Sequence, residues 1–391
     1  MSKYFRNYVQ INLWKIKNNC KKMHALLGGR CKLMVVLKAD AYGYGVEQCA
    51  IACEDADMFA VATIEEALQI RRAGVQTPVL ILGPIDPAEI ETVCQNGLII
   101  TIGSVSYAKQ IQEACKQSGQ QVVCHLKIDT GLNRTGIRCR CGKMEDAYRE
   151  VSQIYAMSAL RVEGVYTHFA CAGSDNPEDQ VFTKTQYDTF FSFCTTMSQR
   201  GFSLGLRHCC STSGIIYHPE MALDMVRTGM TILGQCTCDE DRIRLDLEPA
   251  LCWRARVLQI RDVSEGESVS YDRLYRTTKQ TKIAVIAAGY ADGYKQNYSN
   301  RSRLLLHGCY APVVGKICMD YLMADVSAVP DVKEGDYAIL LGMEGGKEVS
   351  AMELGNVGQV APGGVTCAIT SRVPRIYYPA DLRLLETEIS G

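Results

Sequence analysis

LMVVLKADAYGYGVEQCAIACEDADMFAVATIEEALQIRRAG, residues 33–74, alternates between two kinds of pattern. The runs LMVVL (33–37) and MFAVA (58–62) are short and apolar throughout, as strands buried on both faces are. IEEALQIRRAG (64–74) has helical spacing and ends in a glycine, which commonly follows a helix C-terminus. The stretch therefore predicts parallel strands that alternate with helices.

The same alternation continues to about residue 235. Six more apolar runs follow, which are VLILG (79–83), LIITI (98–102), VVCHLKI (122–128), VEGVYTHF (162–169), LGLRHCC (204–210) and DMVRTGMTIL (224–233). Segments with helical spacing, such as PAEIETVCQNG (87–97), lie between most of them. Eight strand–helix units in about 200 residues indicate a (β/α)8 barrel of the TIM type. A doubly wound open sheet is the competing interpretation.

The pattern changes after about Asp239. Short strand-like runs, among them LCWRARVLQI (251–260) and YAILLG (337–342), are separated by Gly, Pro, Asn and Asp, and helical spacing returns only at 352–361. This predicts a second, mostly antiparallel β-domain. We expect residues 1–238 to form the barrel domain and residues 239–391 the β-domain. The alternating segment 8–13 predicts a first strand, and this strand can pair either with the barrel or with the second domain.

Composition excludes several classes of protein. The 391 residues include 42 basic and 43 acidic ones, so the net charge of -1 predicts neither nucleic-acid nor anionic-membrane binding. The 19 cysteines are odd in number and lack paired CxxC spacing, which favours reduced thiols and no metal site. No apolar run approaches the roughly 18 residues of a membrane span, and the first 19 residues resemble no export signal. We expect a cytoplasmic protein.

The segment VVLKADAYGYG (35–45) carries the strongest chemical signal. Lys38 lies where an apolar strand ends and a loop containing Gly43 and Gly45 begins. In a barrel this is the carboxyl end of a strand, where active sites are built. An amine beside an apolar run loses hydration, which favours its uncharged, nucleophilic form. A lysine that simply reaches solvent is the alternative on position alone.

These residues resemble the cofactor-lysine motif of the alanine racemase family, the fold-type III pyridoxal-phosphate enzymes. Further matches to the family are KIDTGLNRTG (127–136), MVRTGM (225–230), SVSYDRLY (268–275), IAAGYADGY (286–294), GKICMDYLMADVS (315–327) and TSRVPR (370–375). The resemblance implies an N-terminal eight-stranded barrel followed by a β-domain. It also implies pyridoxal 5'-phosphate as cofactor, a homodimer with shared active sites, and an isomerase that converts L-alanine to D-alanine.

The resemblance assigns a role to individual residues. Lys38 matches the Schiff-base lysine and Tyr271 the second catalytic base, so that one base lies on each face of the substrate's α-carbon. Arg134 matches the arginine that reaches the cofactor and the substrate carboxylate, and Lys127 a lysine that is often carbamylated. Met319 matches a substrate-binding residue from the partner subunit. The remaining matches contact the cofactor or its neighbours, and they are Tyr42, His168, Thr212, Arg227, Gly229 and Met230.

The residues themselves support this placement. Lys38, Lys127, His168, Thr212 and Arg227 each lie at the end of a different predicted strand. Polar residues that converge on one barrel face are typical of a catalytic site and unusual in a core. Taken singly, Lys127 reads equally well as a rim ion-pair partner and His168 as a core histidine. For Tyr271 alone, a half-buried packing residue is the default interpretation.

Several positions depart from the family pattern. The tyrosine before RVPR is Ser371, the usual Asn-Ser after the seventh strand is Ser211-Thr212, LYG after the eighth strand is LGQ (233–235), and an acidic position after HFA is Gly173. Because a small Ser371 predicts a wider pocket, a serine or broad-specificity racemase is the closest alternative. A fold-type III decarboxylase lacks support, since its Gly-rich phosphate loop is absent here. A non-catalytic pyridoxal-phosphate-binding protein would not need Tyr271.

Overall fold

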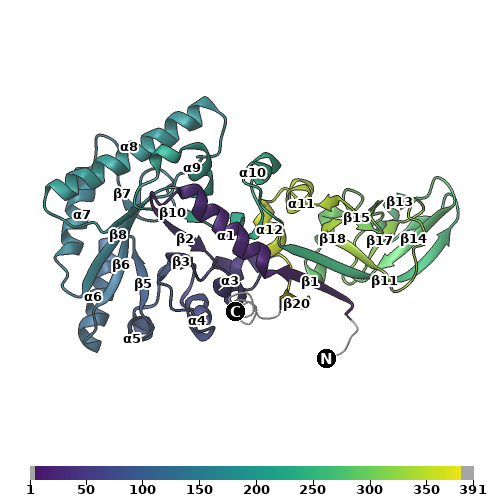
Figure 1. The fold of residues 1–391 in the computed structure, drawn as a ribbon, viewed down its shortest axis with the longest axis horizontal. Helices are drawn as coiled ribbons and strands as arrows, with labels where there is room; N and C mark the ends of the chain where they lie inside the picture. The colour runs from purple at the N-terminus through teal and green to yellow at the C-terminus, as the bar shows by residue number, and fades with distance from the viewer. Residues whose placement is uncertain (1–4, 380–391) are drawn as a thin grey trace, which may run out of the picture. The chain divides into compact units, whose positions relative to one another are not determined.

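The structure, a computed structural model, describes residues 5–379. Its residues group into two compact units. The first, here called the barrel unit, contains residues 20–41 and 53–229. The second, here called the sheet unit, contains the described residues 5–19, 42–52 and 230–379. Each unit has its own sheet, as Figure 1 shows.

Eight parallel strands form the centre of the barrel unit. They run in the order β10 (Met225–Thr228), β2 (Lys32–Val36), β3 (Met58–Val61), β4 (Val79–Ile81), β5 (Leu98–Ile102), β6 (Val122–Asp129), β8 (Leu160–Tyr166) and β9 (Leu206–His208). Hydrogen bonds from Asp224 N to Arg207 O and from Arg227 N to Cys210 O, both 3.0 Å, link the two ends of this order. The predicted eight-stranded barrel is therefore confirmed, and the open sheet is wrong.

Helices surround the strands of the barrel unit (Figure 1). They are α4 (Ile64–Arg72), α5 (Ile90–Gln95), α6 (Val105–Ser118), α7 (Glu145–Tyr155), α8 (Pro177–Gln199) and α9 (Thr212–Tyr217), with the two-residue strand β7 (Ile137–Arg138) beside β6. Side chains cap several of their first turns, as Ser104 does by accepting a hydrogen bond from Tyr107 N. Gly74 and Gly97, which end the two predicted helices, adopt positive φ as expected for C-terminal glycines.

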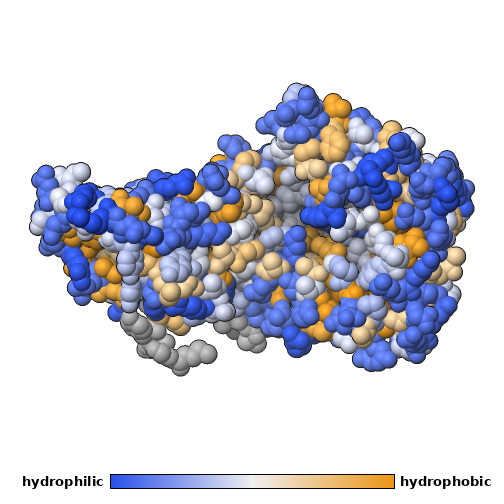
Figure 2. Space-filling model, turned by 180° about the vertical axis from the view of Figure 1, so that it is seen from behind, coloured by the Kyte–Doolittle hydropathy of each residue, from blue (hydrophilic) through white to orange (hydrophobic). Residues whose placement is uncertain are grey.

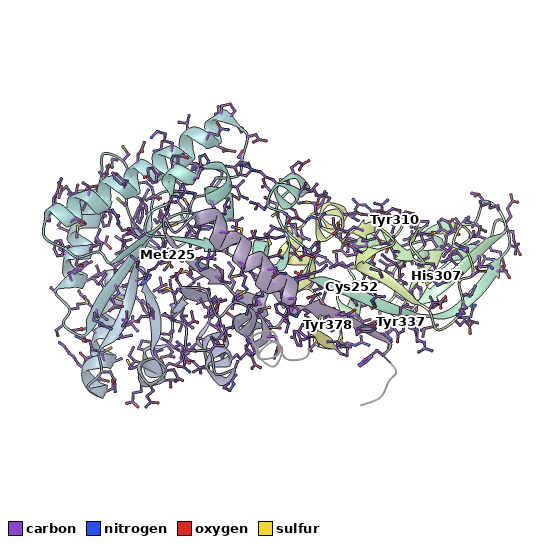
Figure 3. The ribbon with its side chains drawn as sticks, viewed as in Figure 1. Met225, Cys252, His307, Tyr310, Tyr337 and Tyr378 are labelled. Carbon is purple, nitrogen blue, oxygen red and sulfur yellow. The ribbon has the colours of Figure 1, made fainter. Side chains whose placement is uncertain are left out.

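The barrel interior is filled by large apolar side chains. Met34, Met58, Leu80 and Met225, each at most 5% exposed, belong to one cluster drawn from four strands. Figure 3 shows Met225 within the ring of strands. Polar residues predominate on the outer surface of this unit on the face seen in Figure 2. Because side chains fill the interior, chemistry has to be built at the strand ends.

The sheet unit is mostly antiparallel. Its main strands are β1 (Asn7–Asn12), β11 (Leu251–Val263), β14 (Thr281–Ile286), β15 (Arg303–Leu306), β16 (Cys309–Pro312), β17 (Leu322–Asp325), β18 (Tyr337–Glu344), β19 (Lys347–Val349) and β20 (Arg375–Tyr378). A separate hairpin joins β12 (Ser268–Val269) to β13 (Tyr275–Arg276). The segment 8–13 contributes to β1, which pairs antiparallel with β11 and parallel with β20. In Figure 3, Cys252 on β11 and Tyr337 on β18 mark two adjacent strands of this sheet.

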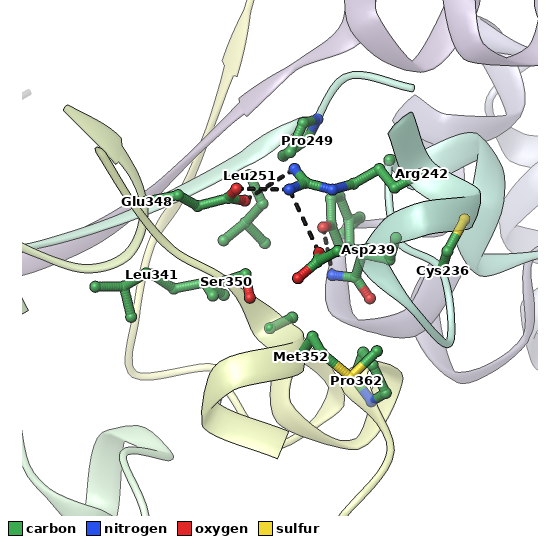
Figure 4. A pocket seen from close by; sticks show the side chains of 16 residues that line it. Cys236, Asp239, Arg242, Pro249, Leu251, Leu341, Glu348, Ser350, Met352 and Pro362 are labelled. Carbon is green, nitrogen blue, oxygen red and sulfur yellow. Dashed lines mark hydrogen bonds and ion pairs between the residues drawn. The ribbon is translucent and has the colours of Figure 1, made fainter. Parts of the chain in front are cut away.

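Two kinds of contact stabilise the sheet unit. The rings of Trp253, Tyr294 and Tyr298 pack edge to face in its core, with centroids 5.8 and 5.1 Å apart. Near α10 (Asp239–Arg244) and α11 (Ala351–Gly358), Arg242 forms a bidentate ion pair with Glu348, at 3.1 and 2.7 Å (Figure 4). Both partners are largely buried, so this pair is screened less than a surface one.

The remaining α-helices are α1 (Leu13–Leu27), α2 (Lys38–Gly43), α3 (Val46–Ala52) and α12 (Pro362–Cys367). Within residues 5–379, no helix has both the length and the apolar character needed to span a bilayer.

Candidate functional site

The predicted site residues of the barrel unit lie at strand ends. Lys38 follows β2, Lys127 lies on β6, His168 follows β8, Thr212 begins α9 after β9, and Arg227 lies on β10. The parallel order of these strands brings their carboxyl ends to one rim. Arg134 comes from the loop that follows β6, and Gly229 directly follows β10.

The backbone after Lys38 turns with the opposite hand to an ordinary helix. Ala39, Asp40, Ala41 and Tyr42 have φ between 50° and 56°, so the short helix α2 is left-handed. Non-glycine residues pay roughly 1–2 kcal/mol each for this conformation. Such strain persists only where the surroundings hold it in place, and it is concentrated at functional sites.

Five hydrogen bonds hold the Arg227 side chain at this rim. It is 5% exposed, and its Nη1 donates to His208 Nδ1 at 2.8 Å and to the His208 carbonyl at 3.1 Å. Its Nη2 donates to the carbonyls of Thr167 and Cys209 and to His168 Nδ1, at 2.8, 3.0 and 3.2 Å. Among the described residues, none accepts a hydrogen bond from its Nε. That donor is available to a ligand.

Positive charges converge around His168. Burial, together with the charges of Arg227, Arg134, Lys127 and Lys38, lowers the pKa of His168 to about 3. Burial and the charges of Arg134 and Arg227 likewise lower the pKa of Lys127 to about 8. Two of these cations share one neighbour, since Lys127 Nζ and the Arg227 guanidinium carbon lie 5.7 and 5.5 Å from the centroid of the Tyr166 ring. The rim is thus strongly electropositive, which suits a ligand with negative charge.

A tight loop holds the segment that carries Arg134. The Asp129 carboxylate accepts hydrogen bonds from the backbone N–H groups of Gly131 and Asn133, at 2.9 and 3.1 Å. Arg140 donates to the Asp129 carbonyl and, at 2.6 Å, to Asn133 Oδ1. Lys127 Nζ donates to Thr135 Oγ1 at 2.6 Å. Sequence reasoning identified Lys127 and Arg134 but missed the supporting residues Thr135 and Arg140.

The other residues predicted to contact the cofactor fall into two groups, one in each unit. In the barrel unit, Thr212 Oγ1 lies 3.1 Å from Thr228 Oγ1, immediately before Gly229. In the sheet unit, Tyr42 and Met230 lie beside Gly363, where an added Cβ would be 3.3 Å from the Tyr42 ring and 2.7 Å from the Met230 sulfur. Burial raises the pKa of Tyr42 to about 12, so its hydroxyl is a hydrogen-bond donor at neutral pH.

Tyr271 and Met319 lie in neighbouring loops of the sheet unit. Tyr271 begins a short turn and is 66% exposed, and Met319 is 53% exposed. Ser270 Oγ donates to the Lys316 carbonyl at 2.5 Å, and Lys316 Nζ lies 2.6 Å from the Asp272 carboxylate. These contacts join the loop before Met319 to the turn around Tyr271.

Two buried histidines near Arg227 were not predicted. His125 and His208 are 1% and 0% exposed, and His125 Nδ1 lies 3.0 Å from His208 Nε2. A signal was available, because each stands inside an apolar run where a polar residue needs a partner. Neither run by itself shows that His125 and His208 face each other in the folded barrel unit.

Both halves of the chain match models of one family. Residues 11–236 match the model described as alanine racemase, N-terminal domain, and residues 250–377 match the model described as alanine racemase, C-terminal domain. The alanine racemase of Methanococcus maripaludis is 36% identical over 373 residues, which cover 95% of this chain and 98% of that protein.

Solved structures give the same result. An alanine racemase of Clostridium difficile 630 has a TM-score of 0.87 and 30% identity over 96% of each chain. The alanine racemase of Bacillus anthracis with bound L-Ala-P has a TM-score of 0.88 and 28% identity over 97% of each chain. Similarity therefore extends over nearly the whole length in both sequence and structure.

Proposed function

The chain belongs to the alanine racemase family and interconverts L- and D-alanine, and we propose that it does so with pyridoxal 5'-phosphate bound at the carboxyl ends of the barrel strands. The observation that carries the cofactor assignment is the nearly buried Arg227 guanidinium at the end of β10, which is fixed by His208 and His168 and keeps its Nε for a ligand. In this proposal residues 1–238 bind the cofactor, and residues 239–391 supply the second base. The L-Ala-P bound to the Bacillus anthracis relative supports a small alanine-like substrate.

The residues present fit that cofactor. Arg227 has a nearly buried guanidinium whose Nε has no acceptor among the described residues, as a donor facing the pyridine nitrogen requires. The Thr212 hydroxyl, the Tyr42 hydroxyl, and the backbone N–H groups of Gly229 and Met230 are the proposed phosphate contacts. When bound, pyridoxal phosphate withdraws electrons from the substrate's α-carbon and makes its proton acidic.

We assign proton transfer to two side chains. Lys38 Nζ holds the cofactor and exchanges a proton with one face of the α-carbon, while the Tyr271 hydroxyl exchanges a proton with the other face. A single base would tend to return the proton to the side that it left, so inversion needs both. Positioned acid–base groups of this kind each contribute about 10²–10⁴-fold in rate.

Arg134 and the backbone N–H of Met319 are the proposed ligands of the substrate carboxylate. We also propose that Lys127 is carbamylated, in a reaction where its neutral amine attacks the carbon of CO2 and releases one proton. The lowered pKa of Lys127 supports this, because it increases the fraction of neutral amine near pH 8. The resulting negative charge would orient Arg134, whose charge already acts on Lys127.

We propose a homodimer in the cytoplasm, with each site completed by the partner's Tyr271 and Met319. The exposure of both side chains supports a surface that meets a second copy. All nineteen cysteines lie in the described residues and none forms a disulfide, which supports a reducing compartment. The proposed role is the supply of D-alanine.

Mixed dimers test the shared site. Lys38→Ala and Tyr271→Phe homodimers should both be nearly inactive when L-alanine is followed by chiral chromatography. After co-expression, random pairing makes about half of the dimers mixed, each with one intact site, so roughly a quarter of wild-type activity should return.

Isolated mixed dimers that stay inactive would contradict the shared site. In that case both bases would come from one chain, or Tyr271 would only pack. The wild type assayed on a panel of L-amino acids is the positive control, and it also decides between alanine and a broader preference.

A further inference from the structure

A line of three polar side chains runs through the apolar interior of the barrel unit. Arg227 on β10 contacts His208 on β9, at 2.8 Å from Nη1 to Nδ1. His208 in turn contacts His125 on β6, at 3.0 Å from Nε2 to Nδ1. All three are at most 5% exposed. The line connects the rim, where Arg227 lies, to a histidine for which the proposed chemistry gives no role.

The donors and acceptors fix the proton positions along this line. Arginine carries only N–H donors, so His208 Nδ1 must accept and its hydrogen must reside on Nε2. That Nε2–H then donates to His125 Nδ1, which therefore accepts as well. The two hydrogen bonds depend on each other, because a hydrogen on the other nitrogen of either histidine would place two donors face to face.

Burial keeps both imidazoles neutral, as this pattern needs. Burial, with a smaller effect of the Arg227 charge, lowers the pKa of His125 to about 4 and moves that of His208 in the same direction. The ring of Tyr166 stacks on His208, with centroids 4.9 Å apart and planes 11° from parallel. His208 is thus held by one ring face and two hydrogen bonds.

Gly164 makes room for His125. A Cβ on Gly164 would lie 2.5–2.6 Å from three atoms of the His125 ring. The pairing of β6 with β8 also shifts register between Cys124 and His125, so that Glu163 is passed over and His125 lies opposite Gly164. A side chain at position 164 would displace the ring, which suggests that this strand pair is built around His125.

We propose that His125 is a positioning residue for Arg227, acting through the orientation of the His208 ring. The inference rests on the proposed placement of Arg227 opposite the cofactor's pyridine nitrogen. With His125 present, His208 offers an acceptor and Arg227 stays fixed. Without it, the buried His208 Nε2–H loses its acceptor, the ring turns towards another acceptor, and its Nδ1 moves away from the guanidinium.

Two substitutions at one position separate this role from packing. His125→Leu fills the space but removes the acceptor, whereas His125→Asn keeps an oxygen where Nδ1 stands. Histidine-selective ¹⁵N NMR of the cofactor-free protein should find His208 with its hydrogen on Nε2 in the wild type and the Asn variant. In the Leu variant the Nε2–H has no acceptor, so its ¹⁵N and ¹H resonances should move towards those of an imidazole N–H without a hydrogen bond. This measurement does not depend on cofactor or activity.

The loaded enzyme gives a second measurement. An arginine does not readily give up its proton. Opposite the cofactor's pyridine nitrogen it would therefore leave that nitrogen unprotonated and restrain the conversion of alanine to its keto acid. His125→Leu should shift the absorption maximum of the bound cofactor. It should also lower the ratio of racemisation to keto-acid formation by about 10-fold to 100-fold, the range typical for loss of a residue that hydrogen-bonds to the ligands of a site. His125→Asn should stay within about 2-fold of wild type.

Controls keep the outcomes distinct. His24→Leu, at a partly exposed histidine of the same unit, should change neither spectrum nor ratio. Gly164→Ala should reproduce the Leu variant in weaker form while every hydrogen-bonding side chain remains. A folded Leu variant whose His208 Nε2–H resonances or product ratio are unchanged would overturn the role of His125. A wild type without racemase activity would instead refute the proposed function, and the NMR result would still stand.

Discussion

The turns beside Lys38 and Tyr271 are built alike but supported differently. Ala39–Tyr42 follow Lys38 with φ of 50–56°, and Ser270, Asp272 and Arg273 flank Tyr271 with φ of 52–67°. Both proposed bases therefore stand beside left-handed, non-glycine backbone. Strain of this kind fixes the direction in which a side chain leaves the chain, provided that the surroundings resist relaxation.

The support of the first turn is internal. Ala41 N donates to the Leu37 carbonyl at 2.8 Å, and Asp40 N donates to Glu66 Oε1 at 3.2 Å, so the barrel unit itself holds the backbone. The second turn is braced by the neighbouring loop through Lys316, yet it leaves Tyr271 66% exposed. The proposed base Lys38 is therefore preorganised within its own unit, whereas Tyr271 needs a second surface to complete its surroundings.

The largest effect should come from Lys38→Ala. Loss of the covalent link and of one base should lower racemisation by more than about 10⁴-fold. Borohydride reduction and mass spectrometry should find the cofactor fixed to Lys38 in the wild type and unattached in the variant. An adduct on another lysine would contradict the assignment.

Tyr271→Phe should lower the rate by about 10²–10⁴-fold while leaving stability nearly unchanged. The hydroxyl is exposed, so its removal breaks no buried contact. Racemisation and urea unfolding measured together check this, with Tyr290→Phe, at an exposed tyrosine (42%), as the matched variant for stability. A large loss of stability would mean that Tyr271 packs rather than reacts.

Acid should destabilise the barrel unit far more than the sheet unit. The pKa values of His125 and His168 are lowered from 6.5 to about 4 and about 3, so below pH 6.5 the unfolded chain binds protons that the folded chain does not. Stability is therefore lost as pH falls from about 6.5 towards 4, by an amount on the order of 3 kcal/mol for His125. Urea midpoints should fall less steeply with acid in His125→Asn.

Ser371→Tyr should narrow the pocket if this position matches the family's tyrosine. The ratio of serine to alanine turnover should fall by roughly three- to tenfold, because the ring would crowd the extra hydroxyl. Chiral chromatography of both substrates measures the ratio. An unchanged ratio would show that position 371 does not set the width of the pocket.

Ala39→Gly should have the smallest effect, a stabilisation of up to about 1 kcal/mol. Glycine removes the free-energy penalty of left-handed backbone in the folded chain. It also raises the conformational entropy of the unfolded chain, and these two contributions to the free energy of unfolding nearly cancel. Gly43→Ala is the opposite case, because φ is 86° and a Cβ would overlap the Thr366 carbonyl oxygen. Urea unfolding should place the two variants on opposite sides of wild type.

Much of the fold was readable because each feature had a local pattern. Eight apolar runs predicted the barrel strands, and the loss of helical spacing after Asp239 predicted the antiparallel sheet. The location of the residues at the strand ends was also predictable. The parallel order of the strands brings Lys127 and Arg227 to one rim, independently of the loop conformations.

What could not be predicted depends on geometry between distant segments. The His125–His208 contact needs a register shift in β6 that leaves no mark in the apolar run. The left-handed turn is hidden for another reason: positive φ is usually signalled by glycine, and Ala39–Tyr42 contain none. Tertiary support overrides local preference there.

The left-handed turn has a stereochemical consequence of its own. Ala39–Ala41 trace the mirror image of an ordinary helical turn, which D-residues adopt without penalty. D-alanine placed at position 39 by chemical ligation should therefore fit better than the encoded L-alanine. A ribosome cannot insert it, so the chain holds a mirror-image segment made of L-residues beside the lysine that is proposed to invert an amino acid.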